Sequence, residues 1–292
     1  MLRRSLPSLA LVLAIAAGPA TARAEEHSVP QFTDRQHFTI DPVVDGLLVV
    51  GGATFDELLG LILATGELRP LPPGPSDKLL SIDRYAVTQT IDPNAGRNSN
   101  FGLWAAYGYA LLDPILSGVR DGRRAFFVDA VLYAESATIA SALTEMTKIA
   151  VRRPRPIDYR NCGADSTSAF CQDDTNLQLS FFSGHASATA ALSGTATYLA
   201  FARSGWRSKR PWITLAAGTL LTAFVSYERV RSGDHFPTDV IVGSMVGGGV
   251  GVLVPHLHRR PHYHEHELEE PPVIIGYAPT PGGGSVTAQM RF

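Results

Sequence analysis

Residues 229–239 read Arg-Val-Arg-Ser-Gly-Asp-His-Phe-Pro-Thr-Asp and separate two long apolar segments. Ser-Gly-Asp at 232–234 is typical of a turn, and Pro237 suits the first position of a new helix. Asp239 then lies about one helical turn beyond His235, within reach of its imidazole. A carboxylate that accepts a hydrogen bond from one ring nitrogen leaves the other nitrogen free to attack an electrophile. The stretch predicts a reactive histidine, unless Asp239 only complements the positive end of the helix.

A second polar stretch, Phe182-Ser183-Gly184-His185, opens an alanine-rich apolar segment. Ser183 can cap the helix that this segment predicts, which would be a purely structural role. The same geometry directs free backbone N–H groups and the positive end of the helix dipole at any bound phosphate. Gly184 allows the backbone to approach closely, and His185 stands where it can touch the same ligand.

A third stretch, residues 148–156, reads Lys-Ile-Ala-Val-Arg-Arg-Pro-Arg-Pro. Lys148 lies near the end of a predicted helix, and Pro154 and Pro156 force the chain beyond it into an extended turn. Lys148 and Arg155 can therefore approach one anion from different directions. The alternative is a solvated cluster whose cations complement the C-terminus of the helix.

Apolar segments rich in Ala, Leu, Val and Ile surround these stretches, without the strict alternation expected of strands. Clusters of Pro and Gly separate them, as at 70–75 and 152–156. We therefore predict an all-α fold, with one helical domain over residues 41–257 after a polar lead-in at 25–40. The six predicted helices are Val43–Ala64, Asn100–Gly118, Arg123–Ala150, His185–Ser204, Pro211–Val230 and Pro237–Pro255.

In order and spacing, the three stretches resemble the signature of the type-2 phosphatidic acid phosphatase and vanadium haloperoxidase superfamily. That signature reads Lys-x6-Arg-Pro, Pro-Ser-Gly-His and Ser-Arg-x5-His-x3-Asp, and it spans residues 148–239 here. The resemblance implies a six-helix bundle of that kind. Two positions depart from it: Phe182 replaces proline, and Glu228 replaces the serine beside Arg229. Adjacent residues on a helix point about 100° apart, so Glu228 need not face a phosphate held by Arg229.

The resemblance also implies roles for the site residues. His235 would attack phosphorus and form a phosphohistidine, with Asp239 orienting it, and His185 would protonate the leaving oxygen and later activate water. The phosphate oxygens would be held by Lys148, Arg155, Ser183, Gly184 and Arg229. Phosphoryl transfer depends mainly on positioning and charge stabilisation, so these cations suffice and no metal cofactor is expected. Vanadate would inhibit a phosphatase. In the alternative activity, a vanadium-dependent haloperoxidase, vanadate would be the cofactor ligated by His235.

The N-terminus is typical of a secretory signal peptide over residues 1–24. Arg3 and Arg4 precede an apolar run at 6–17, and Ala-Arg-Ala follows at 22–24. An uncleaved anchor is the alternative, although the run is short for a membrane span. We expect export, with a periplasmic location.

Cys162 and Cys171 lie nine positions apart in a polar loop. In an oxidising compartment such a pair predicts a disulfide. Metal ligation by this pair is not expected, because no second pair completes a tetrahedral site.

Acidic residues inside the first three predicted helices argue against membrane spans, since charges at the bilayer centre cost a few kcal/mol each. Three crossings would place the 152–160 loop in the cytoplasm, so the basic 203–210 loop after the next helix would lie outside it, against the positive-inside tendency. We therefore expect a soluble or peripheral bundle that contacts a membrane surface, with a membrane-integrated form as the alternative. The acidic residues are Asp45, Asp56, Glu57, Asp113, Asp129, Glu135 and Glu145.

The tail at 258–292 differs from the rest of the chain. Five histidines lie within His256–His266, a tract that either binds zinc or copper or is only a polar exit from the last helix. Apolar segments at 273–275 and 286–292 flank Pro-Gly-Gly-Gly and predict a hairpin.

The formal net charge of −2, without a sustained basic stretch, argues against a nucleic-acid partner. The expected partner is a phosphorylated substrate, with lipids among the candidates. The sequence leaves the substrate and the oligomeric state open. A third reading, from another class, is a non-catalytic exported protein that binds metal through the histidine tract.

Overall fold

The computed structural model describes residues 32–33, 38–65, 71–162, 171, 179–259, 273–280 and 283–290. The expected signal peptide at 1–24 and positions 260–266 of the histidine tract lie outside the described residues.

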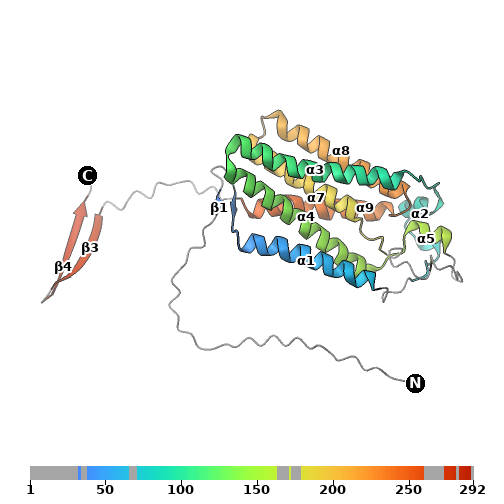
Figure 1. Cartoon of the computed structure of the whole chain (residues 1–292), viewed down its shortest axis with the longest axis horizontal. Coiled ribbons are helices and arrows are strands. Elements are labelled where there is room, and N and C mark those ends of the chain that lie inside the picture. The colour runs from blue at the N-terminus through green and yellow to red at the C-terminus, as the bar shows by residue number, and fades with distance from the viewer. Residues whose placement is uncertain are drawn as a thin grey trace, which may run out of the picture.

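All six predicted helices are present, which confirms the all-α fold. Figure 1 shows them side by side in one bundle. α7 contacts α3, α4, α8 and α9, and α1 packs on α4. The six helices are α1 (Val44–Ala64), α3 (Ala95–Asp121), α4 (Arg123–Val151), α7 (Gly184–Ser204), α8 (Lys209–Arg231) and α9 (Pro237–Leu257).

Several short elements were not predicted, because they are too short or too polar to show an apolar period. A 3-10 turn, η1 (Ser76–Lys78), precedes α2 (Ser81–Thr88), and α5 (Pro156–Asn161) follows the turn after α4. Strands β1 (Phe32–Thr33) and β2 (Thr39–Ile40) pair antiparallel before α1. In the tail, β3 (Val273–Thr280) and β4 (Gly283–Met290) pair antiparallel as the expected hairpin.

α7 and α9 lie unusually close together because of glycines on α9. A Cβ added to Gly247 would lie 2.0 Å from the Ser187 carbonyl oxygen, and one added to Gly251 would lie 2.0 Å from that of Ala191. Small residues at such spacing let helix backbones approach closely. Both helices run in the same direction, since residue numbers rise together along the contact. This packing fixes the first turn of α9 beside that of α7.

Two of the acidic residues in the predicted helices, Asp113 and Asp129, face the interior and are paired with arginines. Asp113, 1% exposed, accepts from Arg210 at 2.9 Å and from the Tyr133 hydroxyl at 3.0 Å. Asp129 is fully buried and pairs with Arg203 at 2.5 Å. Charges inside a bundle therefore give no information about the solvent outside it. The argument from these residues for a water-soluble bundle does not hold.

The outer faces of α1, α3, α8 and α9 are apolar. Large apolar side chains more than half exposed on these faces include Leu47, Leu58, Leu61, Trp104, Leu111, Val119, Ile213, Leu220 and Met245. Two stretches, Arg123–Asn161 and Pro237–Leu257, are long and apolar enough to cross a membrane by length and composition. These features fit the membrane-integrated alternative.

Candidate active site

The candidate site residues lie at one end of the bundle, where α7 and α9 begin and α4 and α8 end. The short helices α2 and α5 lie at the same end (Figure 1). The Ser183 hydroxyl caps α7 by accepting from the Ala186 N–H at 3.5 Å. The Ser183 N–H donates to the Asp239 carbonyl at 3.1 Å, which joins the first turns of α7 and α9. Two positive helix ends therefore face the same region.

His235 lies in the turn between α8 and α9 and is 2% exposed. Gly233 makes this turn possible, because its φ of 76° lies in the left-handed region. The Nδ1 of His235 lies 2.7 Å from the backbone carbonyl oxygen of Ser180. A carbonyl can only accept, so Nδ1 carries the proton and Nε2 of the neutral ring carries the lone pair. Nε2 has no hydrogen-bond partner within the described part of the chain, which makes it the nitrogen available for attack.

Asp239 lies farther from His235 than a direct hydrogen bond requires, with 3.8 Å between Oδ2 and Nδ1. Oδ2 instead accepts from the Phe236 N–H at 2.9 Å and from the Ser180 hydroxyl at 2.5 Å. Asp239 therefore holds Ser180, and the Ser180 carbonyl holds the imidazole. The carboxylate orients His235 mainly through Ser180, a residue that the sequence reasoning missed.

Arg153 anchors the turn after α4 to the start of α9, a role that the sequence did not indicate. Its guanidinium pairs with Asp239 at 2.5 Å and with the fully buried Asp83 of α2 at 2.8 Å. It also lies over the Phe236 ring, 4.0 Å from the centroid. These contacts place Arg153 behind the histidine as a positioning residue.

Arg155 and Arg229 lie on either side of Asp234. The Arg155 Nη1 is 2.8 Å from Oδ1 of Asp234, and the Arg229 Nη2 is 3.0 Å from Oδ2. Burial alone would raise the pKa of Asp234, but the two guanidinium groups lower it below its ordinary value. The Nε of each arginine is buried and has no hydrogen-bond partner among the residues described. Buried donors without acceptors are rare, so both arginines are suited to an added oxyanion.

Lys148, in the last turn of α4, lies beside the start of α7. A Cβ added to Gly184 would be 3.7 Å from the Lys148 Nζ and 3.2 Å from the Thr144 methyl, so this position favours glycine. The Nζ pairs with Glu145 at 2.6 Å. The ammonium group is thus held next to the backbone at which an anion would bind.

His185 lies in the first turn of α7, and its Nε2 is 2.7 Å from the Asn100 Oδ1 on α3. Burial, together with the charges of Arg229 and Lys148, lowers the pKa of His185 to about 3. The ring is therefore neutral at neutral pH while no anion is bound. Asn100 is a second site residue that the sequence reasoning missed.

The same electrostatics act on His235. Burial lowers its pKa to about 4, and Arg229 and Arg155 act in the same direction, while Asp239 opposes them. A neutral imidazole is the nucleophilic form. The cations that would hold a phosphate thus also keep the neighbouring histidine unprotonated.

The two departures from the signature have local explanations. The Phe182 ring is 3% exposed and packs under α9, since a Cβ added to Gly243 would be 3.5 Å from it. The Glu228 carboxylate points to Asn98 at 3.3 Å and to Arg231 at 3.6 Å. These contacts explain the orientation of the Glu228 carboxylate without any contact to a phosphate. The expected disulfide between Cys162 and Cys171 is present just beyond α5.

The fold and the geometry define a class: an all-α bundle with a buried histidine beside arginines and helix N-termini that are suited to an oxyanion. Residues 129–263 match the family model described as the PAP2 superfamily, and all candidate catalytic and phosphate-binding residues lie inside that stretch. This part of the chain belongs to that superfamily. No curated protein matches the chain. A solved structure, the transmembrane PAP2 type phosphatidylglycerolphosphate phosphatase from Bacillus subtilis, is similar at 18% identity and a TM-score of 0.43, covering 72% of this chain and 96% of its own.

Proposed function

We propose that the chain is a phosphatase that hydrolyses phosphomonoesters or diphosphates through a phosphohistidine on His235. The observation that carries this proposal is the pair Arg155 and Arg229. Both have a buried Nε without an acceptor among the described residues, and both lower the pKa of the adjacent His235. A tetrahedral oxyanion bound beside His235 would accept hydrogen bonds from both arginine Nε groups and would lie next to a nucleophilic nitrogen.

In the first step, the Nε2 lone pair of His235 forms a bond to phosphorus and the bond to the leaving oxygen breaks. The imidazole becomes positively charged, and the Ser180 carbonyl at 2.7 Å and the Asp239 carboxylate at 3.8 Å stabilise that charge. The equatorial oxygens lie against Lys148, Arg155 and Arg229, and against the first turn of α7. The proton for the leaving oxygen comes from His185.

His185 must be protonated for this step, although its pKa is about 3 while no anion is bound. A bound phosphate dianion offsets the charges of Arg229 and Lys148, so the pKa of His185 rises when substrate binds. In the second step His185, now neutral, removes a proton from water, which attacks phosphorus and breaks the bond to Nε2. Inorganic phosphate leaves, and His235 is restored.

The test is rapid-quench trapping with a ³²P-labelled aryl phosphate on purified protein. We expect an acid-labile adduct that maps to His235, turnover in the presence of a chelator, and competitive inhibition by vanadate. His235→Ala should form no adduct and lose turnover by about 10³-fold or more. An adduct on His185, or an active His235→Ala protein, would overturn the assignment. Halide oxidation with vanadate and peroxide would instead support a haloperoxidase.

We also propose that the bundle is embedded in a membrane and that its substrates are phosphorylated lipids. The apolar outer faces of α1, α3, α8 and α9 support this, because soluble monomers rarely expose apolar patches of such extent. The inward-facing pairs Asp113–Arg210 and Asp129–Arg203 do not oppose this location, because paired charges inside the bundle are not exposed to lipid. The site lies at the end of the bundle where helix ends meet.

Extraction and a substrate panel test this second proposal. The protein should stay in the membrane fraction after an alkaline carbonate wash and should need detergent for purification. Its kcat/KM should be higher on a long-chain phosphatidate than on a water-soluble phosphomonoester. A monodisperse protein without detergent, or equal use of both substrates, would contradict it. Cleavage after position 24 and recovery from the cell envelope would test the proposed export.

A further inference from the structure

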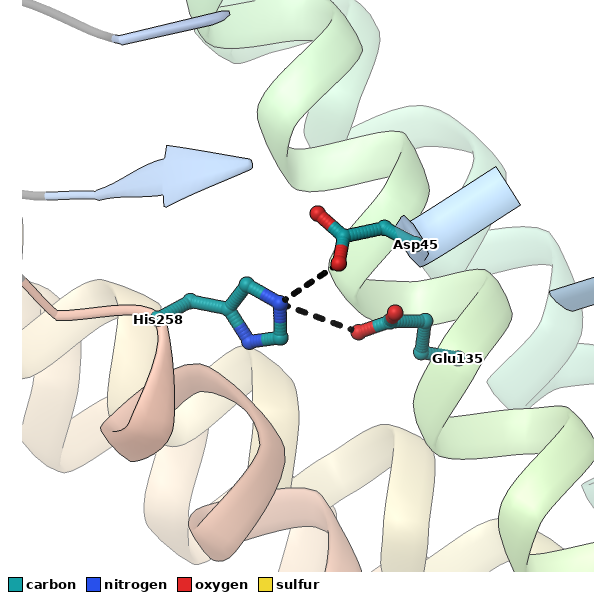
Figure 2. Close-up of side chains that lie close together, drawn as sticks. All are labelled: Asp45, Glu135 and His258. Carbon is teal, nitrogen blue, oxygen red and sulfur yellow. Dashed lines mark ion pairs between the residues drawn. The ribbon is translucent and has the colours of Figure 1, made fainter. Parts of the chain in front are cut away.

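Three ionisable side chains meet at the other end of the bundle, away from the phosphatase site. Asp45 lies at the start of α1, Glu135 lies on α4, and His258 follows the end of α9. Figure 2 shows both carboxylates pointing to one ring nitrogen of the histidine. The His258 Nε2 lies 3.4 Å from Oδ1 of Asp45 and 3.4 Å from Oε2 of Glu135. All three atoms lie within 4.8 Å of one another.

These separations suit metal ligands better than hydrogen bonds. A charge-assisted hydrogen bond between nitrogen and oxygen measures about 2.7–2.9 Å. Ligand atoms bound to tetrahedral zinc at about 2.0–2.2 Å are themselves about 3.4 Å apart. The two distances from Nε2 therefore match the edges of such a tetrahedron.

The histidine is held in the tautomer that a metal requires. Its Nδ1 lies 2.8 Å from the Val254 carbonyl oxygen, which can only accept. Nδ1 thus carries a proton, and Nε2 is the nitrogen that faces the two carboxylates and that a metal ion would use. A hydrogen bond from the second nitrogen to a carbonyl is the usual support for a metal-bound histidine.

The carboxylates also lack the partners that burial demands. Glu135 is 1% exposed, and its Oε1 has no hydrogen-bond partner in the described part of the chain. Asp45 is 4% exposed, and its Oδ2 accepts from the Asp41 N–H at 2.6 Å, which leaves Oδ1 toward the histidine. Two buried carboxylates against one imidazole are short of positive charge, because buried charges need full compensation. The His258 side chain is 17% exposed, so an ion has an entry path.

We propose that Asp45, Glu135 and His258 form a binding site for one divalent metal ion of the zinc class. The ion would tie the start of α1 and the end of α9 to α4, and would stabilise the bundle without taking part in phosphoryl transfer. This proposal does not depend on the proposed phosphatase function. It differs from metal binding by the histidine tract, since it uses only one histidine of that tract together with two buried carboxylates.

The experiment uses the full chain with the tail histidines replaced, His262→Gln, His264→Gln and His266→Gln, so that the tract cannot bind metal by itself. Cobalt(II), which absorbs visible light when tetrahedrally bound, is titrated into metal-free protein, and zinc is then used to displace it. We expect one equivalent to bind. Zinc at a hundredfold excess over its Kd should raise the Tm by about 5 °C.

Single substitutions on this background locate the site. Glu135→Gln and His258→Gln should each abolish the cobalt absorbance and the zinc-dependent rise in Tm. His256→Gln is the matched control: that residue is exposed, bonds to the Tyr198 hydroxyl at 2.9 Å, and should leave binding unchanged. The turnover of each folded variant should equal that of the parent, which separates this result from any failure of the phosphatase assignment.

The Tm of the metal-free protein distinguishes a metal site from an ion pair. Removing the Glu135 charge should leave the Tm of the metal-free protein unchanged or higher, because one uncompensated buried charge is lost. An ion pair predicts a lower Tm for Glu135→Gln and no response of the parent to zinc. Absence of cobalt binding by the background protein, or unchanged binding by Glu135→Gln, would overturn the proposal. If Glu135→Gln does not fold, the same measurements of cobalt binding and Tm on Asp45→Asn test the proposal.

Discussion

The two ends of α9 differ in the sign of the charge that surrounds them. At its N-terminus, Lys148, Arg155 and Arg229 gather around His185 and His235. Beyond its C-terminus, two buried carboxylates face the single imidazole of His258. The helix dipole favours anions at the first end and cations at the second. Side-chain charge and helix polarity therefore reinforce each other, so one bundle can offer an oxyanion site and a cation site at opposite ends.

His185→Ala should have the largest effect, a loss of turnover, and it should disturb only the end of the bundle that holds the candidate active site. Turnover should fall by roughly 10²–10⁴-fold on substrates with poor leaving groups, because the leaving oxygen then lacks a proton donor. The loss should be smaller on an activated aryl phosphate, whose leaving oxygen needs little protonation. Steady-state kinetics on both substrates measure the difference. Equal losses on both would argue against a proton-transfer role, and a loss of the zinc-dependent Tm shift would argue against independence of the two ends.

Gly247→Ala should have an intermediate effect, because it disturbs the contact between α7 and α9 along the bundle. The added methyl would lie 2.0 Å from a backbone oxygen of α7, so the helices must separate, at a cost of about 3 kcal/mol. Turnover should fall as well, because His185 lies on α7 and His235 directly precedes α9, the two helices that move. Gly248→Ala is the matched control, since nothing lies within 4 Å of its added Cβ. Chemical denaturation of the two variants compares them directly, and equal stability would contradict the close packing.

A further effect is a pH dependence of stability that comes from the two histidines of the phosphatase end. The pKa values of His185 and His235 are lowered to about 3 and about 4, below the ordinary 6.5, so the unfolded chain binds more protons than the folded one between these values. Stability therefore rises with pH across this window and is lost as pH falls from about 6.5 toward 4. The loss is at most about 1.4 kcal/mol per pH unit for each histidine.

Thermal melts of the parent and of His235→Gln at pH 5 and pH 7 check this dependence. The parent should lose more stability on acidification than the variant, which lacks one of the two depressed groups. Vanadate should reduce the difference between the pH values by binding at the site. Identical pH slopes for parent and variant would contradict the depressed pKa of His235.

The sequence predicted the helices and the polar stretches of the site, because apolar length and the spacing of charged residues are local properties. It could not predict Ser180, whose contribution to His235 comes from a backbone carbonyl that every residue has. Asn100 was missed because a single asparagine on a distant helix carries no local signal. Asp234 lay inside the quoted stretch, but it was interpreted only as a turn residue. Asp129 and Asp113 led to the prediction of a water-soluble bundle, because their arginine partners lie 74 and 97 positions away and cannot be recognised from the sequence.

Those distant partners also set the order in which the chain can mature. Asp113 and Asp129 lie in the first half of the bundle, but their cations, Arg210 and Arg203, are synthesised only after most of α7 has been made. A nascent chain that ends before residue 203 lacks both arginines, and the loss of one partner of a buried ion pair costs about 3–5 kcal/mol. We therefore expect the early helices to be less stable by themselves than in the complete bundle. Stable assembly should follow only once the loop between α7 and α8 has emerged.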